Sequence, residues 1–312
     1  MGIIKDMKDV IVSVSVCTYN HVDYIENCLD GILAQKTSFP FKIIIGEDES
    51  NDGTREICKD YAKRHQDIIE LHLRQRKNVI YTNGNPTGRY NFIKNLESCT
   101  GKYIALCDGD DHWIDPNKLQ KQVDFLEANS EISMCFTNGI SVDHNNVKID
   151  NIMPEYFHPR KFDTKYLISR DCRIPTASVV FLRNLLDFDL TQFPMGDYPM
   201  YYFLSKKGLI GYLSESSVAY RIHQSSFLRS NSIKELKRNQ ILCIQKILER
   251  DKSELKTLSY NMSVHYDELA GLEFRDKNYI QFFKILSKTL AIYPFRNLRQ
   301  WRDTIYRLRK YE

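Results

Sequence analysis

The chain has 312 residues, of which 42% are hydrophobic and 27% charged, with only 13 glycines and 9 prolines. This composition excludes collagen-like, low-complexity and largely disordered proteins, and the length allows one large domain with or without a smaller appendage. The net charge of +4 arises in residues 296–312, because the rest of the chain is formally neutral, and a neutral body argues against nucleic-acid binding.

Residues 1–9 contain no hydrophobic stretch of the signal-peptide type, and no apolar run reaches the ~18 residues that a membrane-spanning helix needs. We therefore expect a cytoplasmic protein. The eight cysteines are scattered singly. This pattern is typical of reduced thiols that pack as small apolar side chains, not of disulfides or metal sites.

Strand-like and helix-like segments alternate from residue 10 onward, which is typical of an α/β domain with a mostly parallel sheet. Strands are expected at residues 10–17, 41–46, 68–73 and 102–107, and helices at 25–33, from 54, at 91–98 and after 115. Asp115 and Pro116 are expected to be the N-cap and first residue of the last of these helices. The polar residues 83–88 are expected to form a loop.

Beyond about residue 137 the order of elements becomes mixed. Further strands are expected at residues 133–136, 177–182 and 217–222, with a helix at 198–206. Past residue 230, three segments carry apolar residues at helical spacing, at 236–248, 258–272 and 279–290. The sequence thus predicts an α/β domain at residues 1–230 and a helical region at residues 231–312.

Two acidic clusters, at residues 47–52 and 108–111, directly follow predicted strands. Ligands of open α/β sheets bind beyond the carboxyl ends of the strands, so we expect the clusters to converge. A shared acidic crevice would repel an anionic ligand unless a cation lay between them. Carboxylates that leave positions open for phosphates suit Mg²⁺ or Mn²⁺. Either cluster alone is also compatible with ordinary turn and N-cap sequence.

Three strand ends carry motifs: V-S-V-S-V-C-T-Y-N at 12–20, E-D-E-S followed by D-G-T at 47–54, and D-G-D at 108–110. Together they make the chain similar, over about residues 10–225, to glycosyltransferase family 2. Members are inverting enzymes that use nucleotide sugars. The resemblance implies the GT-A fold, a Rossmann-like α/β fold whose mixed, mostly parallel sheet is flanked by helices, here with a C-terminal helical appendage.

The resemblance also implies a nucleotide site at the first strand ends. Thr18, Tyr19 and Asn20 would line the nucleotide. Asp48 would accept hydrogen bonds from uracil or another base. Asp108 would hold the ribose or a metal-bound water.

Two further pairs of residues match family positions near the phosphates. Asp110 of the D-x-D motif, together with His223 of the Y-R-I-H segment, would bind Mn²⁺ or Mg²⁺ at the diphosphate. Arg89 and Asn91 lie where the family often places nucleotide and phosphate contacts, although an arginine on a loop is more often merely solvated. The metal would offset the charge that develops on the departing nucleoside diphosphate.

On the acceptor side, M-G-D-Y at 195–198 resembles the family's catalytic-base segment and makes Asp197 the candidate base. Asp197 could instead simply cap the helix that follows. Thr176 would bond sugar hydroxyls. Two positions depart from the family pattern: Glu49 stands where Gly is usual, and Gly196 stands where an acid is often found.

The C-terminal segment 296–312 places Leu298, Trp301, Ile305 and Leu308 on one stripe among basic residues. Such a helix is typical of peripheral contact with an anionic membrane surface. Docking of the helix on the protein's own core or in a homo-oligomer interface remains an alternative.

The sequence therefore predicts a metal-dependent hexosyltransferase that moves a sugar from a nucleotide-diphosphate donor, with UDP favoured, to a glycan or lipid-linked acceptor in surface polysaccharide synthesis. One alternative is a sugar-phosphate nucleotidyltransferase, although its Gly-rich basic loop is missing after the first strand. Another is a non-catalytic nucleotide- or glycan-binding module, which the intact acidic positions disfavour. A dinucleotide oxidoreductase is disfavoured because no G-x-G-x-x-G follows the first strand.

Overall fold

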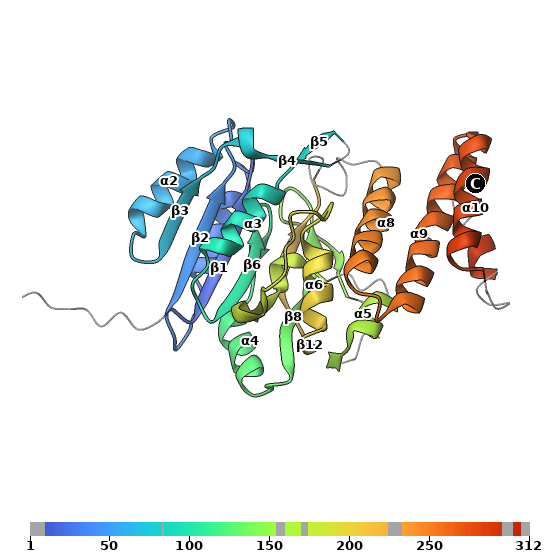
Figure 1. Cartoon of the computed structure of the whole chain (residues 1–312). Helices are drawn as coiled ribbons and strands as arrows, with labels where there is room; N and C mark the ends of the chain where they lie inside the picture. The colour runs from blue at the N-terminus through green and yellow to red at the C-terminus, as the bar shows by residue number, and fades with distance from the viewer. Residues whose placement is uncertain are drawn as a thin grey trace, which may run out of the picture. The chain divides into compact units, whose positions relative to one another are not determined.

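The computed structural model describes residues 10–82, 84–153, 160–169, 174–223, 233–294 and 302–306. These residues form two compact units (Figure 1). The first unit holds the described residues up to 164 together with 174–191 and 200–223. The second holds 165–169, 192–199 and the described residues from 233 onward, so it includes two short segments that precede residue 230.

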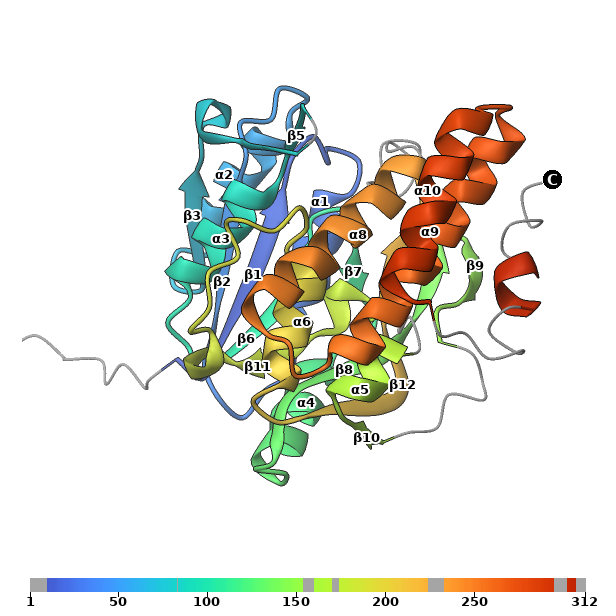
Figure 2. The same cartoon turned by 45° about the vertical axis from the view of Figure 1, so that its right-hand side comes forward.

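A mixed sheet runs through the first unit (Figures 1 and 2). Its strands are β1 (Val12–Thr18), β2 (Phe41–Glu47), β3 (Ile69–Leu73), β6 (Tyr103–Asp108), β7 (His112–Trp113), β8 (Ile132–Val142), β9 (Lys148–Asn151), β10 (Lys161–Phe162), β11 (Val180–Leu182) and β12 (Leu209–Arg221). The order is β10-β12-β8-β11-β6-β1-β2-β3, with β7 beside β12 and β9 beside β8. β1 is parallel to β2 and β6, whereas β11 is antiparallel to β6 and β8. The predicted mixed GT-A sheet is confirmed.

Helices cover both faces of this sheet. The helices of the first 130 residues are α1 (Ile25–Leu33), α2 (Thr54–Arg64), α3 (Arg89–Ser98) and α4 (Lys118–Glu127). Apolar residues of α1, α2 and α4 share one core cluster with Val12, Val14 and Val16 of β1. Because alternate residues of a strand point to opposite faces, Ser13 and Ser15 face α3 instead.

The face under α3 is polar at its centre, and hydrogen bonds within the chain satisfy the amide donors of Asn91 and Asn95. The fully buried Asn95 of α3 donates its amide to Ser15 Oγ at 2.9 Å and to the carbonyl of Ile44 at 2.8 Å. Buried polar groups of this kind require partners, so serines within an otherwise apolar strand mark the side on which α3 lies.

Several elements differ from the sequence-based expectations. A short hairpin of β4 (Ile80–Thr82) and β5 (Asn85–Thr87) occupies part of the predicted loop. α4 begins at Lys118, two residues later than predicted, because the Asp115 carboxylate accepts the backbone N–H of Asn117 and closes a turn before the helix. β8 and β12 are longer than predicted because they pair with each other along most of their length.

The second unit is built around three helices, α8 (Ile233–Arg250), α9 (Leu255–Arg275) and α10 (Tyr279–Ile292), which confirms the three predicted helices. α9 packs against both of the others. The buried carboxylate of Glu273 joins them by accepting bonds from Lys234 and Arg238 of α8 and from Asn278 before α10. None of the described helices is long and apolar enough to cross a bilayer.

Most of the basic segment 296–312 lies outside the described residues, including Leu298, Trp301 and Leu308, so its predicted membrane contact is not tested. Within residues 302–306, Thr304 donates its hydroxyl to the buried carboxylate of Asp267 on α9 at 3.0 Å. Six of the seven described cysteines are buried, and none of those described forms a disulfide, as expected for packing thiols.

Candidate active site

The strand ends that carry the three motifs lie side by side. The parallel register pairs Thr18 with Glu47 and Cys17 with Asp108. Beyond the strands, the N–H of Asp48 donates to the carbonyl of Thr18 at 3.0 Å, and that of Gly109 donates to the carbonyl of Cys17 at 2.9 Å. The predicted convergence of the two acidic clusters on either side of β1 is therefore confirmed.

Next to β2, Asp48, Tyr19 and Arg76 form one group. The Asp48 carboxylate is nearly buried and accepts a bond from the Arg76 guanidinium at 2.7 Å, and this guanidinium stacks 3.9 Å from the centre of the Tyr19 ring. Burial raises the pKa of Asp48 to about 6, although Arg76 partly opposes the shift. Sequence reasoning missed Arg76. The signal that could have found it is its position just after the third strand, in η1 (Arg76–Asn78).

Glu47 and Glu49 of this cluster also have partners. Glu47 is fully buried, pairs with Arg55 of α2 and accepts the N–H of Ser50 at 2.7 Å. Glu49 has a φ of 64°, in the left-handed region that favours glycine, which explains why Gly is usual at this position. Its carboxylate accepts the backbone N–H of Arg76 at 2.6 Å.

Asn20 connects the first and second motifs. Its N–H donates to Ser50 Oγ at 3.0 Å, and its side-chain oxygen accepts the N–H of Asn51 at 3.1 Å. The N–H of the next residue, His21, donates to Thr54 Oγ1 at 2.8 Å. These bonds hold the loop after β1 against the start of α2, and the predicted nucleotide contact of Asn20 stays a prediction.

The D-x-D motif places Asp110 between two histidines. One carboxylate oxygen of Asp110 lies 3.1 Å from His223 Nε2 and 3.9 Å from His21 Nε2. A side chain on Gly109 would come within 2.6 Å of Thr18 Oγ1 and 2.9 Å of His21 Nδ1, so this loop conformation needs glycine. Burial works to raise the pKa of Asp110, but the neighbouring histidines outweigh it and hold this pKa below its usual value. Burial lowers the pKa of His21, which favours the neutral imidazole.

Arg221, at the end of β12, supports this loop. It is almost fully buried, and its guanidinium donates to the carbonyls of Asp110 and Asp143, each at 2.8 Å. Its backbone N–H donates to the Asp111 carboxylate at 2.8 Å, and its guanidinium stacks 4.6 Å from the centre of the Tyr24 ring. Burial and the nearby Asp110 raise the pKa of Asp111. Arg221 lies within the Y-R-I-H segment, of which the sequence had indicated a role for His223 only.

The donor atoms at Asp110 fit a divalent cation. A carboxylate oxygen and an imidazole nitrogen meet there, a combination that suits Mn²⁺ and also serves Mg²⁺ when phosphate oxygens complete the shell. Within the described ranges, no group of three or more His, Cys, Asp and Glu side chains forms a metal site by itself. A cation here would therefore take further ligands from its substrate and from water.

Arg89, Asn91 and Thr176 have protein partners. The buried Arg89 guanidinium donates to the carbonyls of Leu190 and Thr191, and the buried Asn91 amide donates to the carbonyl of Gly46 at 2.7 Å. Thr176 Oγ1 accepts a long bond of 3.5 Å from the Tyr201 hydroxyl. The observed bonds of Arg89 and Asn91 secure the fold, and the predicted substrate contacts of all three residues stay predictions.

Asp197 is the first residue of α6 (Asp197–Ser205) and belongs to the second unit. Its carboxylate accepts the backbone N–H of the next residue, Tyr198, at 2.8 Å, whereas an N-cap side chain accepts an N–H two or three residues further on. Burial raises the pKa of Asp197. The predicted role as catalytic base stays a prediction.

Comparison with known proteins identifies the class to which this fold and site belong. The sequence matches the family described as Glycosyl transferase family 2 over residues 13–184, more than half of the chain. The chain belongs to glycosyl transferase family 2, as its motifs predicted.

Among relatives, an uncharacterized Mycobacterium tuberculosis protein is 35% identical over 217 residues, which cover 68% of this chain and 58% of that protein. The chain thus spans less than two thirds of that relative's length. WfgD of Escherichia coli, a UDP-Glc:α-D-GlcNAc-diphosphoundecaprenol β-1,3-glucosyltransferase, is 29% identical over 238 residues, covering 74% of this chain and 85% of WfgD.

Solved structures share the fold. The structure of residues 1–349 of Staphylococcus aureus TarS, in complex with UDP-GlcNAc, aligns with a TM-score of 0.60 at 18% identity. The alignment covers 91% of this chain and 81% of that TarS chain. The mannosyltransferase PcManGT of Pyrobaculum calidifontis, in complex with GDP-Man and Mn²⁺, aligns with a TM-score of 0.56 at 14% identity, covering 97% and 86% respectively. At these identities the likeness establishes the fold alone.

Proposed function

We propose that this protein is an inverting glycosyltransferase that transfers a sugar from a nucleotide-diphosphate donor to a glycan or lipid-linked acceptor in polysaccharide synthesis. The observation that carries the proposal is the arrangement on either side of β1. The Asp48 carboxylate lies beside Tyr19 and Arg76 on one side, and the Asp110 carboxylate lies beside His223 on the other. The group at Asp48 would bind a base, and the group at Asp110 would bind a diphosphate.

The base would bind at Asp48. An ionised Asp48 is a hydrogen-bond acceptor, so it matches the ring N–H of uracil, and the Tyr19 ring offers an aromatic face for stacking. A UDP-sugar is therefore the donor we favour. The complexes of TarS with UDP-GlcNAc and of PcManGT with GDP-Man are of nucleotide sugars, which supports this class of donor.

Asp110 and His223 would hold Mn²⁺ or Mg²⁺. When bound, the cation neutralises charge on the leaving diphosphate. The chain supports this role because Asp110 is ionised and its nearest charged or polar partners are histidines, one of which burial keeps neutral. Arg221 fixes the position of this carboxylate by bonding the carbonyl of the same residue.

Asp197 would act as the base on the acceptor. An inverting transfer needs a carboxylate that accepts the proton of the acceptor hydroxyl while its oxygen attacks the anomeric carbon opposite the leaving group. The raised pKa of Asp197 brings its basicity closer to that of a group working near neutral pH. A lipid-linked acceptor is supported by WfgD, whose named acceptor is a sugar on diphosphoundecaprenol.

The donor site is tested by titrating UDP with and without Mn²⁺. We expect Mn²⁺ to strengthen UDP binding by the wild type but not by Asp110→Asn. Donor turnover by Asp110→Asn should also fall by about 100-fold or more. Asp124→Asn, which changes an exposed aspartate of α4, is the matched control. Equal titration heats in wild type and Asp110→Asn would reject the metal role. In a panel of nucleotide sugars, release of pyrophosphate in place of UDP would indicate a nucleotidyltransferase.

The base assignment is tested separately with Asp197→Asn. This variant should bind UDP as the wild type does and lose about 100- to 10,000-fold in transfer to an acceptor. Asp187→Asn, at an exposed aspartate paired with Lys207, should keep both properties. Nearly full transfer by Asp197→Asn would show that another group takes the proton.

A further inference from the structure

Helix α10 exposes large apolar side chains. Ile280 is 82% exposed, Phe283 65% and Tyr279 51%, and Leu290 continues the same face. The opposite face, with Ile285 and Thr289, is buried against the rest of the unit. A surface helix normally turns its apolar face to the core, so a second apolar face on the outside indicates a contact surface.

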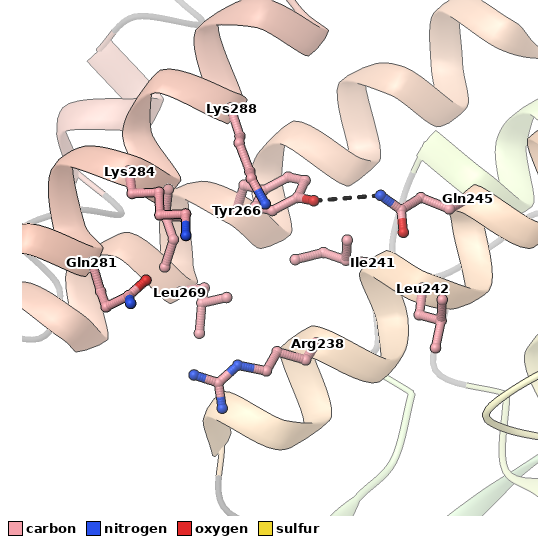
Figure 3. A pocket seen from close by; sticks show the side chains of 10 residues that line it. Arg238, Ile241, Leu242, Gln245, Tyr266, Leu269, Gln281, Lys284 and Lys288 are labelled. Carbon is pink, nitrogen blue, oxygen red and sulfur yellow. Dashed lines mark hydrogen bonds between the residues drawn. The ribbon is translucent and has the colours of Figure 1, made fainter. Parts of the chain in front are cut away.

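A basic edge runs beside this apolar face. Lys284 and Lys288 of α10 and Arg238 of α8 line a cavity of about 250 Å³ between the two helices (Figure 3). Tyr266 and Leu269 of α9 also line it. Arg238 bonds Glu273 at 3.2 Å, whereas within the described part of the chain neither lysine forms an ion pair. The 14 residues of α10 include no acid.

We propose that α10 lies on the surface of an anionic lipid bilayer. Ile280, Phe283 and Leu290 would insert among the upper acyl chains, and Lys284 and Lys288 would meet lipid phosphates at the edge of the inserted face. A helix that combines exposed aromatic and aliphatic residues with lysines and no acids has the composition of an interfacial helix. Each lysine near an anionic leaflet adds to the attraction.

Charge favours a bilayer over a second copy of this chain. A two-fold contact brings the same patch of both subunits together. On α10 such a contact would place Lys284 and Lys288 near their own counterparts with no acid of the helix to offset them. An anionic bilayer instead supplies a negative surface along the whole basic edge.

The proposal concerns residues of α10, which precede 296–312 in the chain, and does not depend on the glycosyl transfer proposed above. It is tested by vesicle flotation of the full chain. Phosphatidylcholine vesicles that contain phosphatidylglycerol should carry the protein, pure phosphatidylcholine vesicles should carry much less, and added salt should weaken binding.

Two pairs of substitutions, each with a matched control, locate the contact. Ile280→Asp with Phe283→Asp should lower vesicle binding by about tenfold or more. The control is Val147→Asp with Ile149→Asp, at residues 60% and 55% exposed in the first unit. Lys284→Glu with Lys288→Glu should lower binding to anionic vesicles, whereas Lys63→Glu with Lys148→Glu, which changes net charge equally at other exposed sites, should not.

Three outcomes would overturn the proposal. Flotation of both α10 variants at the wild-type level would place any membrane contact elsewhere, for example in residues 296–312. Equal losses of vesicle binding in the control variants would show that net charge, and not the position on α10, determines binding. The third outcome is a wild type that has the mass of a dimer and does not bind vesicles, together with an Ile280→Asp, Phe283→Asp variant that has the mass of a monomer. This result would make the face a subunit interface. Because all four substituted side chains are exposed, unfolding is not expected, and the lysine pair provides a second test if the apolar pair fails to fold.

Discussion

The two acidic clusters at the strand ends are balanced in different ways. After β2, Glu47 pairs with Arg55 and Asp48 with Arg76, so each buried carboxylate has its own arginine. After β6, Asp110 faces two histidines. Near this second cluster, the guanidinium of Arg221 donates hydrogen bonds to backbone carbonyls rather than to a carboxylate.

This difference separates two clusters that look alike in the sequence. Glu47 and Asp48 are each compensated by an arginine, whereas the carboxylate of Asp110 contacts imidazole rings. For this reason the divalent cation that we propose is assigned to the cluster after β6. For the cluster after β2, we propose recognition of an uncharged group, such as a base.

The largest expected effect comes from Arg221, which supports the cluster after β6 through the backbone. Arg221→Met leaves the carbonyls of Asp110 and Asp143 without these buried donors, so we expect unfolding free energy to fall by about 3 kcal/mol and Mn²⁺-dependent UDP binding to weaken strongly. Denaturant unfolding and UDP titration measure both. In an Asp110→Asn background, Arg221→Met should cost stability but no further UDP affinity. Wild-type Mn²⁺ dependence in Arg221→Met would contradict the positioning role.

The second prediction concerns Lys118, a fully buried lysine at the start of α4. Its ammonium donates to Gln122 at 2.7 Å and lies 4.1 Å from the centre of the Trp113 ring, and burial lowers its pKa to about 7. The unfolded chain then holds the proton more tightly than the folded one. Unfolding free energy should therefore rise between about pH 7 and 10, by at most about 1.4 kcal/mol per pH unit.

Lys118→Met should remove this rise, and Lys121→Met, at an exposed lysine paired with Asp115, should keep it. Denaturant unfolding at several pH values checks both variants. An equal slope in wild type and Lys118→Met would mean that the buried lysine keeps its proton in the folded chain.

The third prediction concerns the cluster after β2 and uses uridine, which has no phosphate to titrate. With the pKa of Asp48 at about 6, its carboxylate gains a proton as the pH falls below that value. Because the ionised form is the stronger acceptor for the ring N–H, uridine affinity should fall by up to about fourfold from pH 7.5 to pH 5.5. Asp48→Asn should bind weakly at both pH values. A pH-independent affinity of the wild type would reject base recognition by this carboxylate.

The smallest expected effect is that of Glu49→Gly. Glycine relieves the left-handed backbone, by about 1 kcal/mol, but removes the bond to the N–H of Arg76, so the two changes nearly cancel in unfolding free energy. Uridine affinity should change by less than about threefold, because Arg76 keeps its bond to Asp48. Glu49→Ala, which keeps the strain and loses the bond, is the comparison variant and should be less stable than Glu49→Gly. A more stable Glu49→Ala would mean that no strain is present.

Much of the fold followed from local patterns. The alternation of valine and serine in β1 and the polar residues after β1, β2 and β6 predicted the parallel core of the sheet and its functional edge. A strand and its end depend on residues that are close together in the chain, so the sequence shows them directly. The exact start of α4 and the β4–β5 hairpin did not follow, since a side-chain bond from Asp115 and the pairing of two short strands decided them.

The amino-acid sequence by itself determined the family, the mixed sheet, the helices of the second unit and the meeting of Asp48 and Asp110 around β1. Only the tertiary structure decided which carboxylates have arginine partners. Arg76 lies 28 positions from Asp48 in the chain, and Arg221 lies 110 positions from Asp111. Motifs record which residues stand at a strand end, whereas charge compensation depends on distances between segments that only folding brings together.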